Sequence, residues 1–298
     1  MNKLLGASVE IRTNWIGTRR MVLIGIALIG LWSAYQLRLT PHDLVPGVGG
    51  LQQLGRFFAA GCSPALTYEA EFIPQGTEPL LVKVMRAMGA TVVFASAAAS
   101  LSLAVGLVLG FFASSAWWRE DSMSTFTPLS KVLRRVICPA LCGISRVLIA
   151  LMRSIHELLW AVLFLAAMGL THLAAVIAIA IPYSGILAKI FAEMIDEAPR
   201  DTAVAMRSMG AKSPQVFLFG LMPRVIPDLT AYALYRFECA LRSSAVLGFF
   251  GIPTLGYYLK LSFQNSHYHE IWTYLYAVIL LVVVVDVWSG ALRKRIVS

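Results

Sequence analysis

Three long stretches of this chain contain no charged residue. They cover residues 21–37, 87–118 and 158–188. Runs of about 18 or more predominantly apolar residues are typical of membrane-spanning helices. The composition agrees, because 58% of the 298 residues are hydrophobic and 14% are charged, against about 25% charged in soluble domains. These features exclude a soluble enzyme, a disordered chain and a disulfide scaffold, and they argue against a β-barrel, whose strands alternate with a period of two.

Positive charge is distributed unevenly along the chain. Most of its 25 Lys and Arg residues fall in four clusters, and the few that lie between the clusters are offset by acidic residues. Loops on the cytoplasmic side of a membrane carry an excess of Lys and Arg. We therefore expect all four clusters to face the cytoplasm, which accounts for the net charge of +9 without a nucleic-acid partner. The clusters comprise residues 3–20, 119–146, 189–224 and 293–295.

The number of spans follows from this requirement, because an even number of spans must separate two cytoplasmic clusters. The sequence predicts an all-α integral membrane protein with six transmembrane helices and with both termini in the cytoplasm. Residues 136–152 are expected to form a helix on the cytoplasmic side or at the interface, and residues 38–83 to lie outside. The predicted spans are residues 21–37, 84–115, 153–169, 172–192, 226–249 and 271–292.

A long charged segment between the fourth and fifth predicted spans needs a separate explanation. Residues 201–209 are compatible with a helix that Gly210 can end. Pro223 and Pro227 then mark the entry into the next span. From residue 204 the chain reads Val-Ala-Met, three residues, Gly, nine residues, and then Gly-Leu-Met-Pro ending at Pro223.

This pattern resembles the cytoplasmic loop of the permease subunits of bacterial ATP-binding-cassette (ABC) importers. In that family Glu-Ala-Ala, three residues, Gly and nine residues precede an apolar residue, a spacer, Leu and Pro; here Val204 replaces the leading Glu. The resemblance implies a type I ABC importer permease core over residues 84–298, with a cytoplasmic segment at residues 193–225 that couples it to an ATPase. The residues that this implies for coupling are Asp201, Ala205, Arg207, Ser208, Gly210, Ala211 and Pro223.

The remaining regions are then assigned relative to this core. Residues 1–20 would be a cytoplasmic N-terminal segment, residues 21–37 an additional N-terminal transmembrane helix and residues 38–83 a periplasmic segment.

Three further strings, residues 152–164, 188–200 and 232–248, look like the permease of phosphonate importers. The resemblance implies a multi-pass inner-membrane subunit that carries a phosphorus oxyanion such as phosphonate, phosphite or hypophosphite. It implies three kinds of partner: a second permease copy or a paralogue, two cytoplasmic ATP-binding subunits and a periplasmic solute-binding protein. The chain itself is expected to be no enzyme and to bind no cofactor, because ATP and Mg²⁺ would belong to the ATPase.

Charged residues inside predicted spans are the candidates for the translocation path. A charge at mid-bilayer is costly and usually faces a cavity or a partner. Arg suits phosphorus oxyanions because its planar guanidinium can bind two oxygens. The spacing of the charged residues in these spans predicts two i, i+4 pairs, Arg153 with Glu157 and Glu238 with Arg242. The alternative to a role in the path is that these charges form salt bridges that fix helix packing. The five candidates are Arg153, Glu157, Arg236, Glu238 and Arg242.

Other signals in the sequence are weak. Residues 210–213 read Gly-Ala-Lys-Ser, which lacks the glycine spacing of a phosphate-binding loop. His267 and His269 lack a third ligand for a metal, and the four Cys lack zinc spacing. The alternatives to an oxyanion importer are an ABC permease for another small solute such as an amino acid, an ion-coupled secondary transporter, for which no internal repeat is found, and a membrane enzyme.

Overall fold

The computed structural model of this chain describes residues 14–40, 47–70, 72, 74–118, 131–212 and 215–297. Most of the predicted N-terminal segment and much of the loop after the second span lie outside these ranges. The described residues form helices joined by turns and contain no β-strand. The helices are α1 (Asn14–Gln36), α2 (Val48–Gly61), α3 (Leu80–Ala113), α4 (Ser115–Trp118), α6 (Lys131–Ser154), α7 (Glu157–Met168), α8 (His172–Glu197), α9 (Asp201–Ser208), the π-helix η2 (Val216–Leu221), α11 (Met222–Val246), the 3₁₀-helix η3 (Leu247–Phe250), α12 (Leu255–Gln264) and α13 (Tyr268–Val297).

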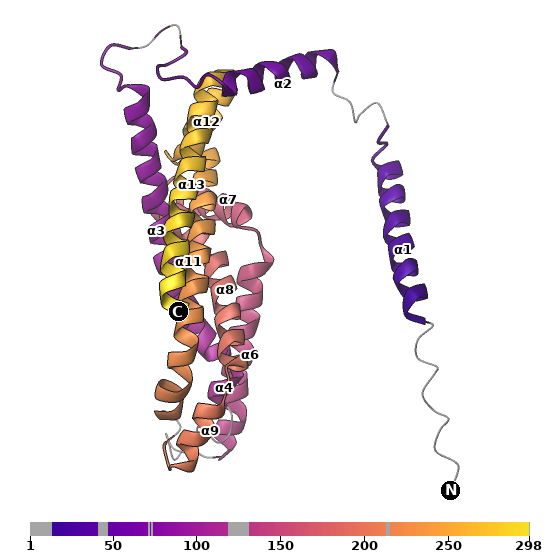
Figure 1. The fold of residues 1–298 in the computed structure, drawn as a ribbon, viewed down its shortest axis with the longest axis vertical. Coiled ribbons are helices and arrows are strands. Elements are labelled where there is room, and N and C mark those ends of the chain that lie inside the picture. The colour runs from indigo at the N-terminus through magenta and orange to yellow at the C-terminus, as the bar shows by residue number, and fades with distance from the viewer. Residues whose placement is uncertain are drawn as a thin grey trace. The chain divides into compact units, whose positions relative to one another are not determined.

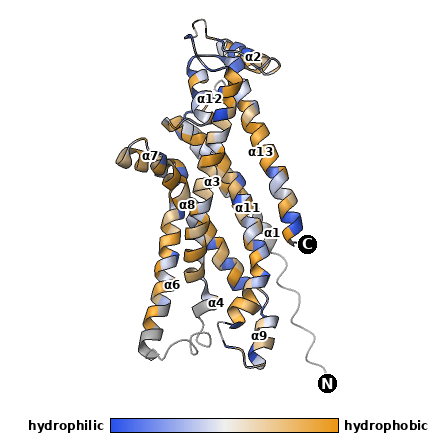
Figure 2. Cartoon of the chain, turned by 90° about the vertical axis from the view of Figure 1, so that its left-hand side faces the viewer, coloured by the Kyte–Doolittle hydropathy of each residue, from blue (hydrophilic) through white to orange (hydrophobic). Residues whose placement is uncertain are grey.

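The chain divides into two compact units, residues 1–58 and residues 59–298. The first unit contains α1, whose apolar part runs from Arg20 to Gln36 and is shorter than the four helices that are long enough to cross a membrane. The second unit is a bundle in which α3, α8 and α11 pack together, with α13 along α11 and α6 along α8 (Figure 1). Hydrophobic residues follow the long helices of this bundle over most of their length (Figure 2).

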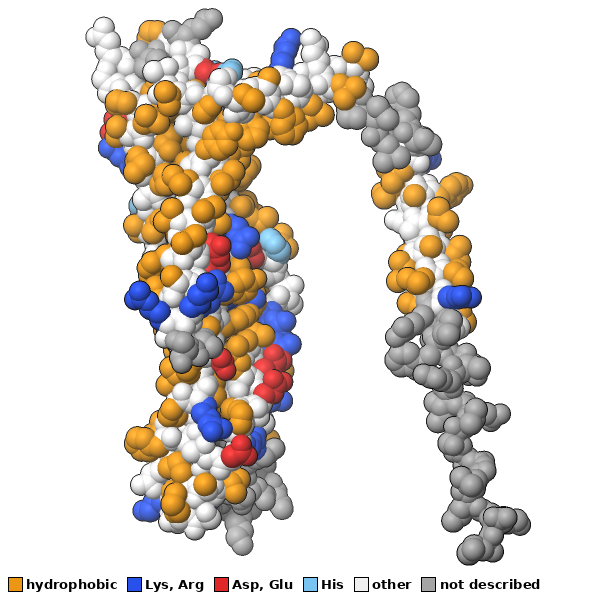
Figure 3. All heavy atoms as spheres, in the orientation of Figure 1, with side chains coloured by type: hydrophobic (Ala, Val, Ile, Leu, Met, Phe, Trp, Pro, Cys, Tyr) orange, Lys and Arg blue, Asp and Glu red, His pale blue; other side chains and the backbone are white. Residues whose placement is uncertain are grey.

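Long apolar helices dominate the second unit. Among the described residues, four helices are long and apolar enough to cross a membrane, and a bent helix pair could supply a fifth crossing. Their outer faces carry exposed hydrophobic side chains, as along α13 at Ile279, Val283 and Val287, and such side chains cover much of the surface in Figure 3. This is the pattern expected of helices that face lipid, and the chain is a multi-pass membrane protein. The four helices are Leu80–Ala113, His172–Glu197, Val216–Phe250 and Tyr268–Ile296.

Small residues bring α3 and α8 into close contact. A Cβ atom on Gly106 would lie 2.8 Å from the Cβ of Leu187, and one on Gly110 would lie 3.0 Å from the backbone oxygen of Ala188. Small residues at such contacts let membrane helices approach closely enough for extensive packing. Elsewhere along these helices Phe94, Ala98, Ala178, Tyr183 and Leu241 belong to one buried core shared by α3, α8 and α11.

The predicted third span is wrong in its boundaries. Residues 153–169 do not form one helix, because α6 ends at Ser154 and α7 begins at Glu157 with a bend of 90° between them. His156 caps α7, its ring nitrogen accepting a hydrogen bond from the backbone N–H of Leu158 at 3.3 Å. Residues 136–152, expected to form a helix on the cytoplasmic side or at the interface, lie within α6, which packs along α8 and α3. Helices α8 and α13 contain the spans predicted for them, the predicted span 84–115 extends two residues beyond α3, and the predicted span 226–249 runs from α11 into η3.

One end of the bundle is fastened by two carboxylates. The backbone N–H of Glu69 donates to Glu270 Oε1 at 2.8 Å, and the backbone N–H of Glu270 donates to Glu69 Oε2 at 3.3 Å. Ser262 Oγ donates to the second oxygen of Glu270 at 3.0 Å. Glu69 lies in the segment before α3, Ser262 in α12 and Glu270 in the first turn of α13. These bonds therefore join that segment to α12 and α13.

Candidate functional site

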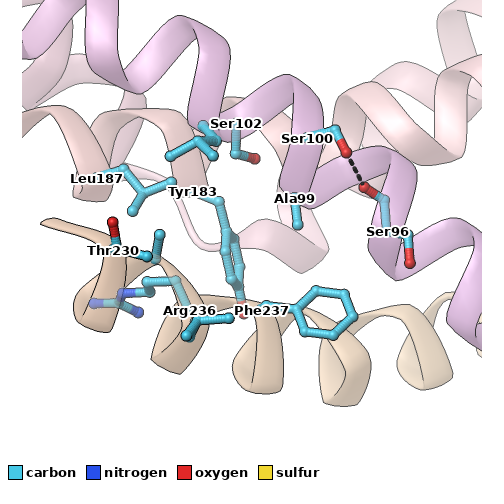
Figure 4. Close-up of a pocket in the computed structure, with 12 residues that line it drawn as sticks. Ser96, Ala99, Ser100, Ser102, Tyr183, Leu187, Thr230, Arg236 and Phe237 are labelled. Carbon is cyan, nitrogen blue, oxygen red and sulfur yellow. Dashed lines mark hydrogen bonds between the residues drawn. The ribbon is translucent and has the colours of Figure 1, made fainter. Parts of the chain in front are cut away.

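A cavity of about 270 Å³ lies between α3, α8 and α11 (Figure 4). Drug-sized ligands usually occupy pockets of about 300–1,000 Å³, so this cavity suits a small ion or solute. Its wall is mostly apolar and carries five hydroxyl groups and one charge, that of Arg236. The lining residues are Ser96, Ala99, Ser100, Ser102 and Leu103 from α3, Tyr183 and Leu187 from α8, and Thr230, Ala233, Leu234, Arg236 and Phe237 from α11.

Arg236 is held from one side by two tyrosines of its own helix. Its Nε donates to the hydroxyl of Tyr232 at 2.9 Å. The guanidinium carbon lies 5.3 Å from the ring centre of Tyr232 and 5.8 Å from that of Tyr235, within the range of cation–π attraction. Because Tyr232 uses the Nε–H, the two terminal nitrogens remain for a ligand. The spacing of four residues between Tyr232 and Arg236 places them on one face of α11.

Tyr183 connects the cavity to a carboxylate on α7. Its hydroxyl lies 2.9 Å from Ser243 Oγ, and Ser243 Oγ donates to Glu157 Oε1 at 2.9 Å. A serine hydroxyl has one hydrogen, so Ser243 must accept the hydrogen bond from Tyr183. The two hydrogen bonds link Tyr183 of α8, Ser243 of α11 and Glu157 of α7. Residue spacing alone could not reveal this link between three helices.

Of the five path candidates, the cavity wall includes Arg236. Glu157 reaches the wall through Ser243 and Tyr183, while Arg153 is exposed at the end of α6. The predicted pair of Arg153 with Glu157 on one helix is wrong, because the 90° bend separates them.

The predicted pair of Glu238 with Arg242 is also wrong. Glu238 is 7% exposed and accepts a hydrogen bond from Arg293 Nη2 of α13 at 3.1 Å. Arg242 is exposed and lies 3.7 Å from the sulfur of Cys239. Glu238 therefore fastens α11 to α13, which is the packing role that the sequence offered as the alternative to a path.

The predicted coupling segment forms a short helix followed by a sharp turn. Helix α9 ends where Gly210 takes a φ of +83°. The Gly210 N–H donates to the oxygen of Arg207 at 2.9 Å and the Ala211 N–H donates to that of Met206 at 3.0 Å. These two bonds make a Schellman motif, in which a glycine in the left-handed region ends the helix. The prediction that Gly210 terminates this helix is confirmed.

One face of α9 packs on the base of α11 and the other is exposed. A Cβ on Gly220 of η2 would lie 3.1 Å from the sulfur of Met206 and 3.6 Å from the Cα of Ala203. On the outer face Val204 is 64% exposed and Met209 is 78% exposed. Among the predicted coupling residues the exposed ones are Asp201, Ala205, Arg207, Ser208, Gly210 and Pro223, and Ala211 is half-buried.

Asp196 near the end of α8 was not singled out by the sequence. Its carboxylate accepts hydrogen bonds from Ser114 Oγ at 2.7 Å and from the backbone N–H groups of Ser115 at 3.0 Å and Ala116 at 2.9 Å. Arg146 of α6 lies 3.7 Å from the same carboxylate. Asp196 thus joins α3, α4, α6 and α8 five residues before the coupling helix begins. The sequence does not distinguish Asp196 from its acidic neighbours Glu193, Glu197 and Asp201.

No group of three or more His, Cys, Asp or Glu residues that could hold a metal occurs within the described ranges. His267 and His269 instead lie beside the two carboxylates that fasten the bundle end. His267 Nδ1 is 3.8 Å from Glu270, and His269 Nε2 is 3.8 Å from Glu69.

Comparison with known proteins agrees with this arrangement. Residues 106–298 match the family described as binding-protein-dependent transport system inner membrane component, and this chain belongs to that family. It is 35% identical over 157 residues to the phosphite transport system permease protein PtxC of Stutzerimonas stutzeri, covering 53% of this chain and 57% of that protein. It is 27% identical over 234 residues to the phosphate-import permease protein PhnE of Mycolicibacterium smegmatis, covering 78% and 41%. The match thus spans about half the length of each of these relatives.

Solved structures share the fold. A chain of the MetNI methionine ABC transporter in an inward-facing conformation superimposes with a TM-score of 0.58 at 18% identity, covering 74% of this chain and 99% of that one. A chain of an amino acid ABC transporter gives a TM-score of 0.57 at 16% identity, with the same coverage. At this identity the likeness concerns the fold alone, which is that of an ABC importer permease.

Proposed function

We propose that this chain is the membrane-spanning permease of an ATP-driven importer of phosphorus oxyanions, located in the bacterial inner membrane. The observation that carries the proposal is Arg236, the one charged residue among those lining a small cavity between three apolar helices. A guanidinium fixed by Tyr232 offers two nitrogens to an anion, and Arg binds phosphorus oxyanions bidentately. The names of the two relatives, which concern phosphite and phosphate, support this class of substrate.

A transport experiment tests the role of Arg236. Oxyanion uptake is measured in cells that express the transporter with Arg236→Ala, with Arg236→Lys, or with Arg242→Ala as a control for an exposed arginine on the same helix. Loss of a charge-assisted hydrogen bond is worth about 1.5–3 kcal/mol, so Arg236→Ala should lower uptake at least about tenfold. Arg236→Lys should retain part of the activity, and Arg242→Ala should retain most of it. Normal uptake by Arg236→Ala in a normally assembled complex would remove Arg236 from the path.

We propose further that α9 docks on a separate ATPase subunit. Its outer face carries exposed apolar side chains, Val204 and Met209, in a segment otherwise rich in charge. Its inner face is fixed to η2 and hence to α11, which contributes Arg236 to the cavity wall. A movement of the docked subunit would therefore be transmitted to the cavity wall through one continuous helix.

The complete transporter in this proposal contains two permease chains, either two copies of this chain or a copy and a paralogue. Two cytoplasmic ATP-binding subunits hold ATP and Mg²⁺, and a periplasmic solute-binding protein delivers the oxyanion. Crosslinking tests the arrangement, because a Met209→Cys variant should form a crosslink to the ATPase subunit, whereas Ser266→Cys beside α12 should not. A Met209→Cys variant that crosslinks to no ATPase subunit would contradict the docking.

A further inference from the structure

Most hydroxyl groups of the cavity already donate their hydrogen within the protein, which bears on the protonation state of the ligand that they can bind. Ser100 Oγ donates to the backbone oxygen of Ser96 at 2.7 Å, as the dashed line in Figure 4 shows. Ser102 Oγ donates to the oxygen of Ala98 at 2.6 Å and lies 3.2 Å from that of Ala180 on α8, and Thr230 Oγ1 donates to the oxygen of Ile226 at 2.8 Å. Each of these side chains therefore uses its one hydrogen on a backbone oxygen of the protein and presents only lone pairs to a ligand.

Tyr183 has the same property for a different reason. Ser243 Oγ donates to Glu157, so Tyr183 donates its hydrogen to Ser243 and keeps only lone pairs. Four of the five hydroxyls on the wall thus accept hydrogen bonds, and Ser96 is the exception among the lining residues because its hydroxyl has no bond within the protein. A ligand seated here meets these acceptors in addition to the guanidinium of Arg236.

The balance of charge around the cavity points in the same direction. The wall carries one positive charge, and an ionised oxyanion in a low-dielectric site needs a partner for each charge. Arg236 can neutralise one negative charge, while Glu157 behind Ser243 would repel a second. The charged and titratable groups that face the cavity or act on its wall are Arg236 and Tyr183 on the wall, Tyr232 and Tyr235 against Arg236, Glu157 behind Ser243, and Cys239 near Tyr183.

We propose that the cavity selects a singly charged oxyanion that still carries a proton on oxygen, with its charge on Arg236 and its O–H donated to Ser102, Thr230 or Tyr183. This inference rests on the proposed function and narrows it to one protonation state of the substrate. Monohydrogen phosphite meets the requirement. Doubly charged phosphite does not, since it has no hydrogen to donate and one charge too many. Hypophosphite has the single charge but no O–H when ionised, which makes it a probe that separates charge from hydrogen bonding.

The test uses the complete transporter in proteoliposomes with ATP inside and the binding protein outside. Import of phosphite and of hypophosphite is followed together with the pH of the lumen, buffered above the second pKa of phosphite. A monoanion that enters this lumen loses one proton, so phosphite import should release one proton per ion more than hypophosphite import at equal ATP turnover. The proton count reports the protonation state that crosses the membrane, and the wall variants described next assign its selection to the cavity rather than to the binding protein.

Variants of the wall provide the second measurement. Ser102→Ala and Thr230→Val each remove an acceptor and should lower phosphite import several-fold while leaving hypophosphite import unchanged. Ser184→Ala is the matched control, because Ser184 Oγ also bonds the backbone oxygen of Ala180 but does not line the cavity. It should leave both rates unchanged.

Two results would overturn the inference while leaving the proposed function intact. One is phosphite import with no proton release beyond that of hypophosphite, and the other is an equal loss of both ions in Ser102→Ala and Thr230→Val. Import of neither ion by the unmodified transporter would instead overturn the proposed function, and this inference with it.

Discussion

Gly210 occupies a position of the coupling segment where the backbone favours glycine. Its φ of +83° lies in the left-handed region, which costs an L-residue about 1–2 kcal/mol. We expect Gly210→Ala to unwind the end of α9 and to weaken the coupling of ATP hydrolysis to transport. Hydrogen exchange over residues 201–212 should become faster by roughly tenfold. Gly210→Asn is the control, because Asn tolerates this conformation better, and a Gly210→Ala variant with unchanged exchange would contradict the role of the turn.

Asp196 supports a second prediction about a single side chain. Asp196→Asn removes the charge that three donors share, and charge-assisted hydrogen bonds contribute about 1.5–3 kcal/mol each. We expect a lower midpoint of thermal unfolding in detergent. Glu193→Gln is a suitable control, because its exposed ion pair with Lys189 is worth less than about 0.5 kcal/mol. Equal midpoints for the two variants would show that Asp196 does not stabilise the junction of α3, α6 and α8.

The partners of buried charges could not be predicted from the sequence. Spacing predicted Arg242 as the partner of Glu238, but the structure pairs Glu238 with Arg293, 55 residues further along the chain. An i, i+4 rule describes neighbours on an isolated helix surface, whereas a buried carboxylate is paired by whichever helix packs over it. The sequence did identify Arg236 as a charge in a span, but the hydroxyls that surround it come from three helices and no local pattern connects them.

Among the helices, those with clear hydropathy limits were predicted well and the bent pair was not. The ends of α8 and the break after Gly248 carry Thr, Gly and Pro signals, and the structure has its boundaries there. The bend between α6 and α7 occurs at Ile155 and His156, where neither Gly nor Pro marks it. The requirement that an even number of spans separates two cytoplasmic clusters constrains the number of crossings. It carries no information on which part of an apolar stretch makes the crossing.

The contact between α9 and η2 supports a prediction about two elements. Gly220 leaves room for Met206, and a larger side chain would push α9 away from the base of α11. We expect Gly220→Leu to uncouple the transporter, so that basal ATPase activity persists while oxyanion uptake falls several-fold. Gly143→Leu on α6 is the matched control, because a Cβ there meets nothing within 4 Å. Equal uptake by the two variants would exclude this contact from the coupling route.

For the molecule as a whole, the placement of charge and the fold lead to one orientation in the membrane. Helices α9 and α12 lie at opposite ends of the second unit (Figure 1), and α13 extends about 45 Å, enough to cross a bilayer of about 30 Å. The basic residues after Lys189 gather at the α9 end, which the positive-inside rule assigns to the cytoplasm. Cys62 is exposed near the other end, since the adjoining Gly61 accepts a hydrogen bond from Tyr276 of α13.

Cys62 therefore makes the orientation testable without altering the bundle. A membrane-impermeant maleimide should label Cys62 in intact spheroplasts, and Cys62→Ser should abolish that labelling. Met209→Cys introduced into the Cys62→Ser chain should react only after permeabilisation, because the 78% exposed side chain of Met209 belongs to the end that the proposed orientation places in the cytoplasm. The reverse labelling pattern would show the opposite orientation in the membrane. The exposed face of α9 would then lie outside the cell, where no ATP-dependent partner could reach it.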